Sequence, residues 1–363
     1  MKLRKIVFKT VRQIGRMFYR KHVWLISDRE RVAGDNGEAF FKFLQSKNVN
    51  AVFAIRKDCE DYERISRIGR VVDMNSLKYK FLLCVSDCHC SSQLLHMENH
   101  QETPQIFLQH GVAYSDIANM LRNFRHNNFY IITVSEMERE QMIRAGVKES
   151  NVWLTGLPRF DYLKNDSQNK IVIAFSWRAS LSGKTEDELK EACYFKMLER
   201  ITKDVELHEE IHRRGYELYL MLHPEVLKYK HFFSESDMCH FYTNSYNKLY
   251  EEASLMVTDY SSAISDCVYL YKPIIYFHFD GNQFYDGNPY ISPGIFDFSE
   301  NGFGPVVYDY DKFKAELLKI LGNGCVMDDF YHKRVDAYFK YIDSDNCERV
   351  FGKISELLQS NKN

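Results

Sequence analysis

The sequence at residues 255–262 is LMVTDYSS, and this stretch decides the fold class. Its first residues form a short apolar run of the kind found in buried strands. The run ends in hydroxyl and carboxyl side chains, and a helical pattern follows over residues 263–270. A buried strand that leads directly into a helix is typical of the βαβ units that build parallel sheets.

The same alternation extends along the chain in both directions, and a polar linker at residues 165–169 separates two series of elements. The first series has predicted strands at 23–27, 49–55, 70–72, 81–85, 105–109, 130–134 and 151–155, with helices at 35–46 and from Ser135 onward. The second has predicted strands at 171–175, 217–222, 255–258 and 273–277, with helices at 189–213, 313–321 and 331–358. This order predicts an α/β protein with two Rossmann-like domains that face a central cleft. The predicted segments are a basic amphipathic helix at 1–21, a first domain at 22–165, a second domain at 166–330 and a closing helix at 331–363.

Composition excludes several classes of protein. The 363 residues are 45% hydrophobic and carry a formal net charge of -2, so no global positive field favours a nucleic-acid partner. Nine cysteines spread through a chain of this length indicate reduced thiols rather than a secreted disulfide scaffold. Because the sequence also lacks a run of about 20 apolar residues and a secretory signal, we expect a cytoplasmic protein.

The first 21 residues carry eight Lys or Arg and no acidic residue. Apolar residues recur at helical spacing, which predicts one apolar face. Such a helix can lie on an anionic membrane surface, where each basic residue contributes about 1 kcal/mol. An ordinary helix packed on the body of the protein is an equally good interpretation. The apolar face consists of Leu3, Val7, Val11, Ile14 and Phe18.

Two histidines follow predicted strands, where ligands of open parallel sheets bind. His110 and Gly111 come after residues 105–108, and His223 comes after residues 218–222. An imidazole suits proton transfer near neutral pH, and glycine allows close approach of a ligand or a positive φ. A histidine that only hydrogen-bonds within a turn is the alternative.

The segment after the strand at 255–257 predicts a phosphate site. Ser261 and Ser262 stand where backbone N–H groups and hydroxyls meet at a helix start. Asp266 lies four residues on and can accept a hydrogen bond from a ribose hydroxyl. Thr258 and Asp259 are further candidates, and plain helix capping is the alternative for this segment.

Trp177 and Arg178 follow the strand at 171–175 and offer a stacking face and a bidentate phosphate-binding fork. A surface arginine beside a packed tryptophan is the alternative. Because all four segments occupy the same topological place in two domains, we favour function over capping. The dense cysteine and histidine cluster is interpreted as buried thiols, since its spacing does not match a structural zinc site. That cluster consists of Cys84, Cys88, His89 and Cys90.

The ordered set of motifs resembles the CDP-glycerol glycerophosphotransferases, the family of teichoic acid primases and polymerases, over residues 24–321. The motifs are His-Gly, Gly-Leu-Pro-Arg at 156–159, Trp-Arg, His-Pro and Thr-Asp-Tyr-Ser-Ser with a later Asp. The resemblance implies a GT-B fold with an acceptor domain first and a CDP-donor domain second. It also implies transfer of glycerol phosphate or ribitol phosphate from a CDP-linked donor to a hydroxyl of a lipid-linked glycan, with release of CMP.

By this resemblance, His110 is the general base and His223 the second essential histidine. It places Arg159, Trp177, Arg178, Ser261, Ser262 and Asp266 at nucleotide-binding positions. No cofactor is required. A metal is not demanded, although Asp259 could bind a divalent ion together with the diphosphate. The enzyme is expected at the cytoplasmic face of the membrane.

Two positions depart from the family pattern. Met221 stands where an arginine is common, and residues 112–114, Val-Ala-Tyr, replace Thr-Pro and a basic residue. The identity of the CDP-linked donor is therefore left open. A GT-B glycosyltransferase that uses CMP-sialic acid or another nucleotide sugar for capsule synthesis is the first alternative function. A non-catalytic adaptor on the membrane surface is the second.

Overall fold

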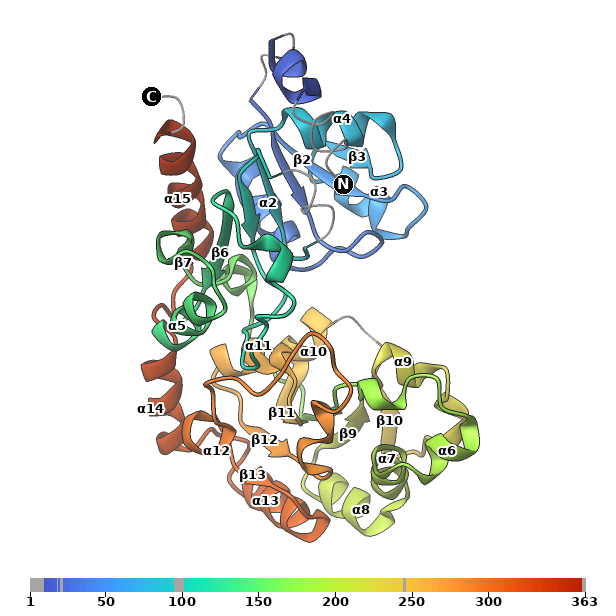
Figure 1. Cartoon of the computed structure of the whole chain (residues 1–363). Coiled ribbons are helices and arrows are strands. Elements are labelled where there is room, and N and C mark those ends of the chain that lie inside the picture. The colour runs from blue at the N-terminus through green and yellow to red at the C-terminus, as the bar shows by residue number, and fades with distance from the viewer. Residues whose placement is uncertain (1–9, 18, 20–21, 95–100, 244–245, 361–363) are drawn as a thin grey trace. The chain divides into compact units, whose positions relative to one another are not determined.

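A computed structural model describes residues 10–17, 19, 22–94, 101–243 and 246–360 (Figure 1). The chain divides into two compact units, each built on one parallel sheet. Unit 1 comprises residues 1–112, 118–162 and 339–363, and unit 2 comprises residues 113–117 and 163–338. The predicted α/β class with two parallel sheets is confirmed, whereas the cleft between the domains stays a prediction.

Unit 1 contains a seven-stranded sheet of order β3-β2-β1-β4-β5-β6-β7. Strands β2, β4, β5 and β6 are buried along their whole length, as expected of parallel strands covered on both faces. The strands are β1 (Trp24–Ser27), β2 (Ala51–Ile55), β3 (Val71–Asp73), β4 (Cys88–Ser91), β5 (Gln105–Phe107), β6 (Phe129–Thr133) and β7 (Val152–Leu154). The helices include α2 (Asn36–Ser46), α3 (Asp61–Ser66), α4 (Leu77–Val85), α5 (Glu136–Arg144) and α15 (Asn346–Ser360).

Unit 2 contains a six-stranded sheet of order β10-β9-β8-β11-β12-β13. The strands are β8 (Lys170–Ala174), β9 (Glu217–Leu220), β10 (Cys239–Phe241), β11 (Ala253–Thr258), β12 (Ile274–Phe277) and β13 (Val306–Val307). The helices include α6 (Glu186–Glu191), α7 (Cys193–Lys203), α8 (Val205–Arg213), α9 (Pro224–Leu227), α10 (Tyr246–Glu252), α11 (Ser265–Tyr269), α12 (Phe298–Asn301), α13 (Tyr310–Gly322) and α14 (Asp329–Tyr338).

Both sheets have the Rossmann strand order. The first three strands follow one another toward one edge of the sheet, and the chain then returns to the middle and adds the remaining strands toward the other edge. This reversal lies between β1 and β4 in unit 1 and between β8 and β11 in unit 2. Ligands of open α/β sheets bind beyond the carboxyl ends of the strands at this switch point. The residues that follow these four strands are therefore the first place to look for a site in each unit.

Several predicted elements differ from the structure in their type or extent. Residues 81–85 belong to helix α4, which Ser76 caps, and the strand of this region is β4. The predicted helix at 189–213 is three helices, because the backbone is extended at Ala192 and Asp204 caps α8. The predicted closing helix is two helices, of which α14 belongs to unit 2 and α15 to unit 1.

The C-terminal helix α15, red in Figure 1, lies beside elements of unit 1. The Asp161 carboxylate accepts hydrogen bonds from the backbone N–H groups of Asn346 and Cys347 at 2.9 and 2.7 Å, so it caps this helix. Gly156 has a φ of 79° and lies so close that an added Cβ would be 1.8 Å from the Asn346 side chain. The chain therefore needs glycine at position 156 for α15 to dock.

The basic N-terminal helix falls partly outside the described residues, since residues 1–9, 18, 20 and 21 are not described. Residues 10–17 are helical. Arg12 donates to the carbonyl oxygens of Cys84 and Ser86, and Arg16 pairs with Asp87 at 2.6 Å. Two of the basic side chains therefore bind the body of unit 1 instead of pointing to solvent.

Candidate functional site

His110 follows β5, and the backbone on its N-terminal side is held firmly. Gln109 has a φ of 55°, a left-handed conformation that is uncommon for a residue with a side chain. Its carbonyl oxygen accepts from the Asn36 side chain at 2.8 Å, and its side-chain amide donates to the Ile132 carbonyl at 2.5 Å. The positive φ thus belongs to Gln109, not to Gly111, which is buried.

Arg159 supports His110 through the backbone. Its guanidinium Nη1 donates to the His110 carbonyl oxygen at 3.0 Å and to Asp35 at 2.8 Å. The backbone N–H of Arg159 donates to the side chain of Asn36 at 3.0 Å. Because the arginine is buried and engaged within unit 1, the structure gives it a supporting place and does not favour the predicted direct contact with the nucleotide.

His110 is exposed by its surface area, yet the protein packed around its ring favours the neutral form. Burial within dense protein lowers its pKa, and the charges of Arg29 and Arg159 lower it further. The Asp35 carboxylate and a hydrogen bond with the Ser92 backbone act in the opposite direction but do not cancel this effect. A neutral imidazole at pH 7 can accept a proton, as a general base must.

Asp28, which sequence reasoning missed, occupies the switch point of unit 1 directly after β1. Its carboxylate is fully buried and accepts hydrogen bonds from the backbone N–H groups of Gly37, Asp35 and Glu38 at 2.8, 3.1 and 3.1 Å. An added Cβ at Gly37 would lie 2.5 Å from this carboxylate, so glycine permits the close approach. The start of helix α2 is therefore filled by one of the protein's own carboxyl groups.

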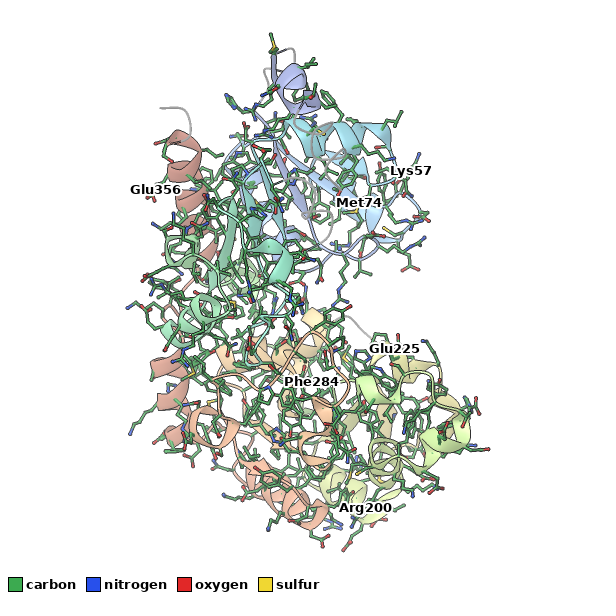
Figure 2. The ribbon with its side chains drawn as sticks, in the orientation of Figure 1. Lys57, Met74, Arg200, Glu225, Phe284 and Glu356 are labelled. Carbon is green, nitrogen blue, oxygen red and sulfur yellow. The ribbon has the colours of Figure 1, made fainter. Side chains whose placement is uncertain are left out.

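His223 follows β9 by three residues and caps the short helix α9. Its ring nitrogen Nδ1 accepts from the backbone N–H of Glu225, labelled in Figure 2, at 3.2 Å. In the neutral ring this leaves Nε2 carrying the proton, so His223 can donate a hydrogen bond to an anion. The Trp177 ring stacks on His223 at 6.5 Å with an interplanar angle of 17°, and it donates from Nε1 to Ser182.

Arg178 is 1% exposed and lies between two buried carboxylates. It donates to Asp280 at 2.7 and 3.0 Å, to Asp259 at 2.7 Å and to the carbonyl oxygen of Ser176 at 2.7 Å. The guanidinium group of Arg178, which was predicted to bind phosphate, is thus already bound to carboxylates within unit 2. Turning a buried arginine away from two carboxylates is costly, and phosphate contact by Arg178 stays a prediction.

Asp259 organises the switch point of unit 2. Its carboxylate accepts from the backbone N–H groups of Ser176, at 3.0 Å to each oxygen, and of Tyr260, at 2.7 Å. The ring of Tyr260 stacks between His278 at 3.9 Å and Phe284, labelled in Figure 2, at 4.9 Å. The buried ion network therefore fixes both loops that border β8 and β11.

The predicted phosphate segment divides into accessible and buried residues. Ser261 and Ser262 are half-buried, whereas Thr258 and Asp266 are fully buried. The Thr258 hydroxyl donates to the Ala174 carbonyl at 2.8 Å. Asp266 is buried, and its contact with the ribose stays a prediction. The helix after Ser262 is also shorter than predicted, a 3-10 turn at Ser262–Ile264 followed by α11.

Each unit thus pairs accessible predicted residues with buried ones that hold them. The accessible residues are His110 in unit 1 and His223, Trp177, Ser261 and Ser262 in unit 2. The supporting residues that sequence reasoning missed are Asp28, Asp35, Asn36, Gln109 and Asp280. Asp28 directly follows a strand, so the rule that located the histidines also points to it.

The cysteine cluster is buried as predicted, with Cys88 and Cys90 on β4 and Cys84 on α4. Within the described ranges, no group of three or more His, Cys, Asp or Glu side chains is placed to hold a metal ion. Over the same residues, no helix combines the length and the apolar character that crossing a membrane requires.

Comparison with known proteins identifies the family. The profile of the CDP-Glycerol:Poly(glycerophosphate) glycerophosphotransferase family matches residues 8–356. The minor teichoic acid biosynthesis protein GgaB of Bacillus subtilis (strain 168) is 28% identical over 380 residues, an alignment that covers 97% of this chain. The chain spans 42% of the length of that relative.

Solved structures show the same fold. The wall teichoic acid polymerase TagF has a TM-score of 0.68 at 17% identity, covering 99% of this chain and 97% of that one. A TagF variant soaked with CDPG has a TM-score of 0.67 at 16% identity and covers 100% of both chains. A putative UDP-N-acetylglucosamine 2-epimerase from Listeria monocytogenes is less similar, with a TM-score of 0.58 at 12% identity, covering 94% of this chain and 98% of that one.

The two parallel sheets match the fold of TagF, and the family profile extends over nearly the whole chain. The chain therefore belongs to the CDP-glycerol:poly(glycerophosphate) glycerophosphotransferase family, a family of transferase enzymes.

Proposed function

We propose that this protein transfers a polyol phosphate from a CDP-linked donor to a hydroxyl of a lipid-linked, teichoic-acid-like acceptor and releases CMP. The observation that carries the proposal is the family match over residues 8–356, which includes both histidines. The CDPG-soaked TagF structure, which has the same fold, supports glycerol phosphate as the transferred group. The name of GgaB supports a role in teichoic acid synthesis.

In the proposed reaction, His110 is the general base. The acceptor hydroxyl oxygen attacks the phosphorus that carries the polyol, and the bond from this phosphorus to the bridging oxygen of the diphosphate breaks. The hydroxyl proton moves to the neutral His110 ring, and CMP leaves with the bridging oxygen. A lowered pKa and a fixed backbone both suit His110 to this role.

Unit 2 is proposed to hold the donor. The donating Nε2 of His223 stabilises charge on the phosphoryl oxygens, and Trp177 keeps the imidazole plane in place by stacking. The hydroxyls and backbone of Ser261 and Ser262 supply further donors. Met221 is half-buried at a position where an arginine is common in the family, so we expect weaker electrostatic stabilisation of the donor than an arginine would give.

The acceptor is proposed to be reached at a membrane surface through residues 10–17. Val11, Ile14 and Met17 are 37%, 52% and 70% exposed, and their spacing puts them on one side of the helix. Phe81 is also exposed and contacts Tyr19. Because Arg12 and Arg16 bind the body of unit 1, this apolar row points away from it and suits shallow insertion into lipid.

Two measurements test the proposal. CDP-glycerol, CDP-ribitol, CMP-sialic acid and UDP-sugars are offered separately with lipid-linked acceptors, and the released nucleotide is identified. CMP release from CDP-glycerol or CDP-ribitol with growth of the acceptor supports the proposed reaction, whereas release from CMP-sialic acid alone contradicts it. Sedimentation with anionic vesicles then compares the wild type with Ile14→Asp, which we expect to weaken binding without changing CMP release from a soluble acceptor.

A further inference from the structure

Residues 113–117, called the strap here, belong to unit 2 although the chain on both sides of them belongs to unit 1. The strap begins three residues after His110. In sequence, the candidate base His110 is thus separated by two residues from a segment that belongs to unit 2. The contacts of the strap show what holds it.

Tyr114 is the anchor of the strap. It is 1% exposed, and its ring packs against Phe296 at 4.5 Å and Tyr338 at 6.1 Å. Its hydroxyl lies 3.2 Å from the Ser265 hydroxyl, at the start of α11. Ser265 in turn donates to the Ser262 carbonyl oxygen at 2.6 Å. The strap is therefore joined by two hydrogen bonds to the proposed donor segment.

A second route joins the strap to the same segment. The Ser115 hydroxyl lies 3.4 Å from that of Tyr285, whose ring contacts Tyr260 at 5.5 Å. Asp116 pairs with Ser292 as an antiparallel bridge, with two backbone hydrogen bonds of 2.8 and 3.1 Å. These contacts hold the strap along its length, so it is unlike a loop that merely crosses a surface.

The chain just before His110 is held equally well by unit 1, through the contacts of Gln109. Only His110, Gly111 and Val112 separate this clamp from the strap. Any displacement of the donor segment that moves Tyr114 must therefore be absorbed within three residues, one of which is the candidate base.

We propose that Tyr114 is a positioning residue that couples occupation of the donor segment in unit 2 to the placement of His110. This inference rests on the proposed function. It adds a route by which donor binding in unit 2 changes the position of the His110 side chain.

The test uses Tyr114→Phe, which keeps the packed ring and removes the hydroxyl. CMP is the probe, because it occupies the donor segment without a polyol that would reach the base. NMR of histidine-labelled full-length protein follows the His110 imidazole signal, assigned by its loss in His110→Gln. Tyr308→Phe, which removes a hydroxyl from a tyrosine of unit 2 that is 60% exposed, is the matched control.

In the wild type, we expect saturating CMP to shift the His110 signal. In Tyr114→Phe, the shift should fall by at least about half and kcat by about 5-fold or more, while the Kd for CMP stays within about 3-fold. The Tyr308→Phe control should behave as the wild type. An unshifted wild-type signal, or a Tyr114→Phe variant with wild-type kcat and shift, overturns the coupling.

Ser265→Ala gives an independent check, since it removes the other partner of the Tyr114 hydroxyl. If the two groups act through one interaction, the double variant should lose no more kcat than the more damaged single variant. Additive losses would overturn this route. A wild type that neither binds CMP nor releases it from a CDP-linked donor contradicts the proposed function, whereas normal turnover without a His110 shift contradicts only the coupling.

Discussion

The switch points of the two units each carry an aspartate, but the two aspartates bind different groups. In unit 1, Asp28 follows β1 and accepts hydrogen bonds from the first turn of α2, an eleven-residue helix. In unit 2, Asp259 follows β11 and binds Arg178 and the loop after β8, while the helix beyond it has only five residues. Both carboxylates are fully buried.

Under the proposed function, this difference assigns the base to unit 1 and the donor to unit 2. The helix start of unit 1 is closed by an internal carboxyl group, that of Asp28, which already accepts from the N–H groups of Gly37 and Glu38. Unit 2 keeps its carboxylate occupied with a guanidinium and leaves Ser261 and Ser262 at the surface. We therefore expect variants of unit 1 to change the rate alone and exposed variants of unit 2 to change donor binding as well.

The largest effect is expected for His110→Ala in unit 1. Loss of the base should lower kcat by about 10²–10⁴-fold, while the Kd for CDP-glycerol stays within about 3-fold. His22→Ala, at an exposed histidine of the same unit, is the control for both measurements. A variant that keeps most of its turnover would show that the base lies elsewhere.

Arg178→Met should cause the next largest effect, on stability. Removal of the guanidinium leaves the carboxylates of Asp259 and Asp280 buried without their cation, which typically costs about 3–5 kcal/mol. Urea unfolding measures the loss, and Arg31→Met, at an exposed pair with Asp58, should cost about 1 kcal/mol or less. If Arg178→Met is as stable as the wild type and has lost only donor affinity, Arg178 binds phosphate as predicted and is not chiefly a structural residue.

Asp28→Asn tests the closed helix start of unit 1 and should cost about 1–3 kcal/mol, because the amide group cannot accept all three hydrogen bonds. Burial raises the pKa of Asp28 to about 7, with the charge of Asp35 adding to the effect. A raised pKa favours the protonated folded state, so this contribution to stability is full below about pH 4 and is lost as the pH rises through 7.

Calorimetry at pH 5.5 and 8 measures this dependence. The difference in stability between the two pH values should be smaller in Asp28→Asn than in the wild type. Asp58→Asn, at an exposed carboxylate of unit 1, should retain the wild-type difference. An Asp28→Asn variant as stable as the wild type at pH 8 would show that the start of α2 does not depend on the carboxylate.

An effect of similar size to that of Asp28→Asn, but on donor binding and rate, is expected for His223→Ala in unit 2. Loss of one hydrogen bond to a charged group corresponds to about 1.5–3 kcal/mol, so donor affinity and kcat together should fall by about 10–100-fold. His212→Ala, at an exposed position of the same unit, is the control. If CDP-glycerol affinity is unchanged and kcat alone falls, His223 belongs with the chemistry of the base and the proposed division between the units fails.

Sequence reasoning could find the histidines, because strand ends are local features. His110 and His223 each follow a short apolar run, and the structure puts both at carboxyl ends of parallel strands. It could not decide the type of residues 81–85, since a short apolar run fits a buried strand and a buried helix equally well. Strand β4 escaped notice because its sequence, Cys-His-Cys-Ser, is not that of a typical strand.

The supporting residues were harder to find because their partners are remote in sequence. Arg178 meets carboxylates 81 and 102 residues further along the chain, and nothing in the local sequence shows that both close around it. Arg159 contacts the His110 carbonyl oxygen 49 residues before it. Such contacts form only in the folded sheet. Whether a charged side chain is buried or accessible can therefore be decided only once the fold is known.

The docking of α15 on unit 1 has a consequence for biosynthesis. Unit 2 is built mainly from residues 163–338, whereas unit 1 needs residues 339–363 to complete its packing. On the ribosome, unit 1 can therefore complete its packing only after residues 339–363 have been made, whereas most of unit 2 is made before them. A translation product that stops after α14 would present an intact second half joined to an unfinished first half, a ready substrate for chaperones and proteases.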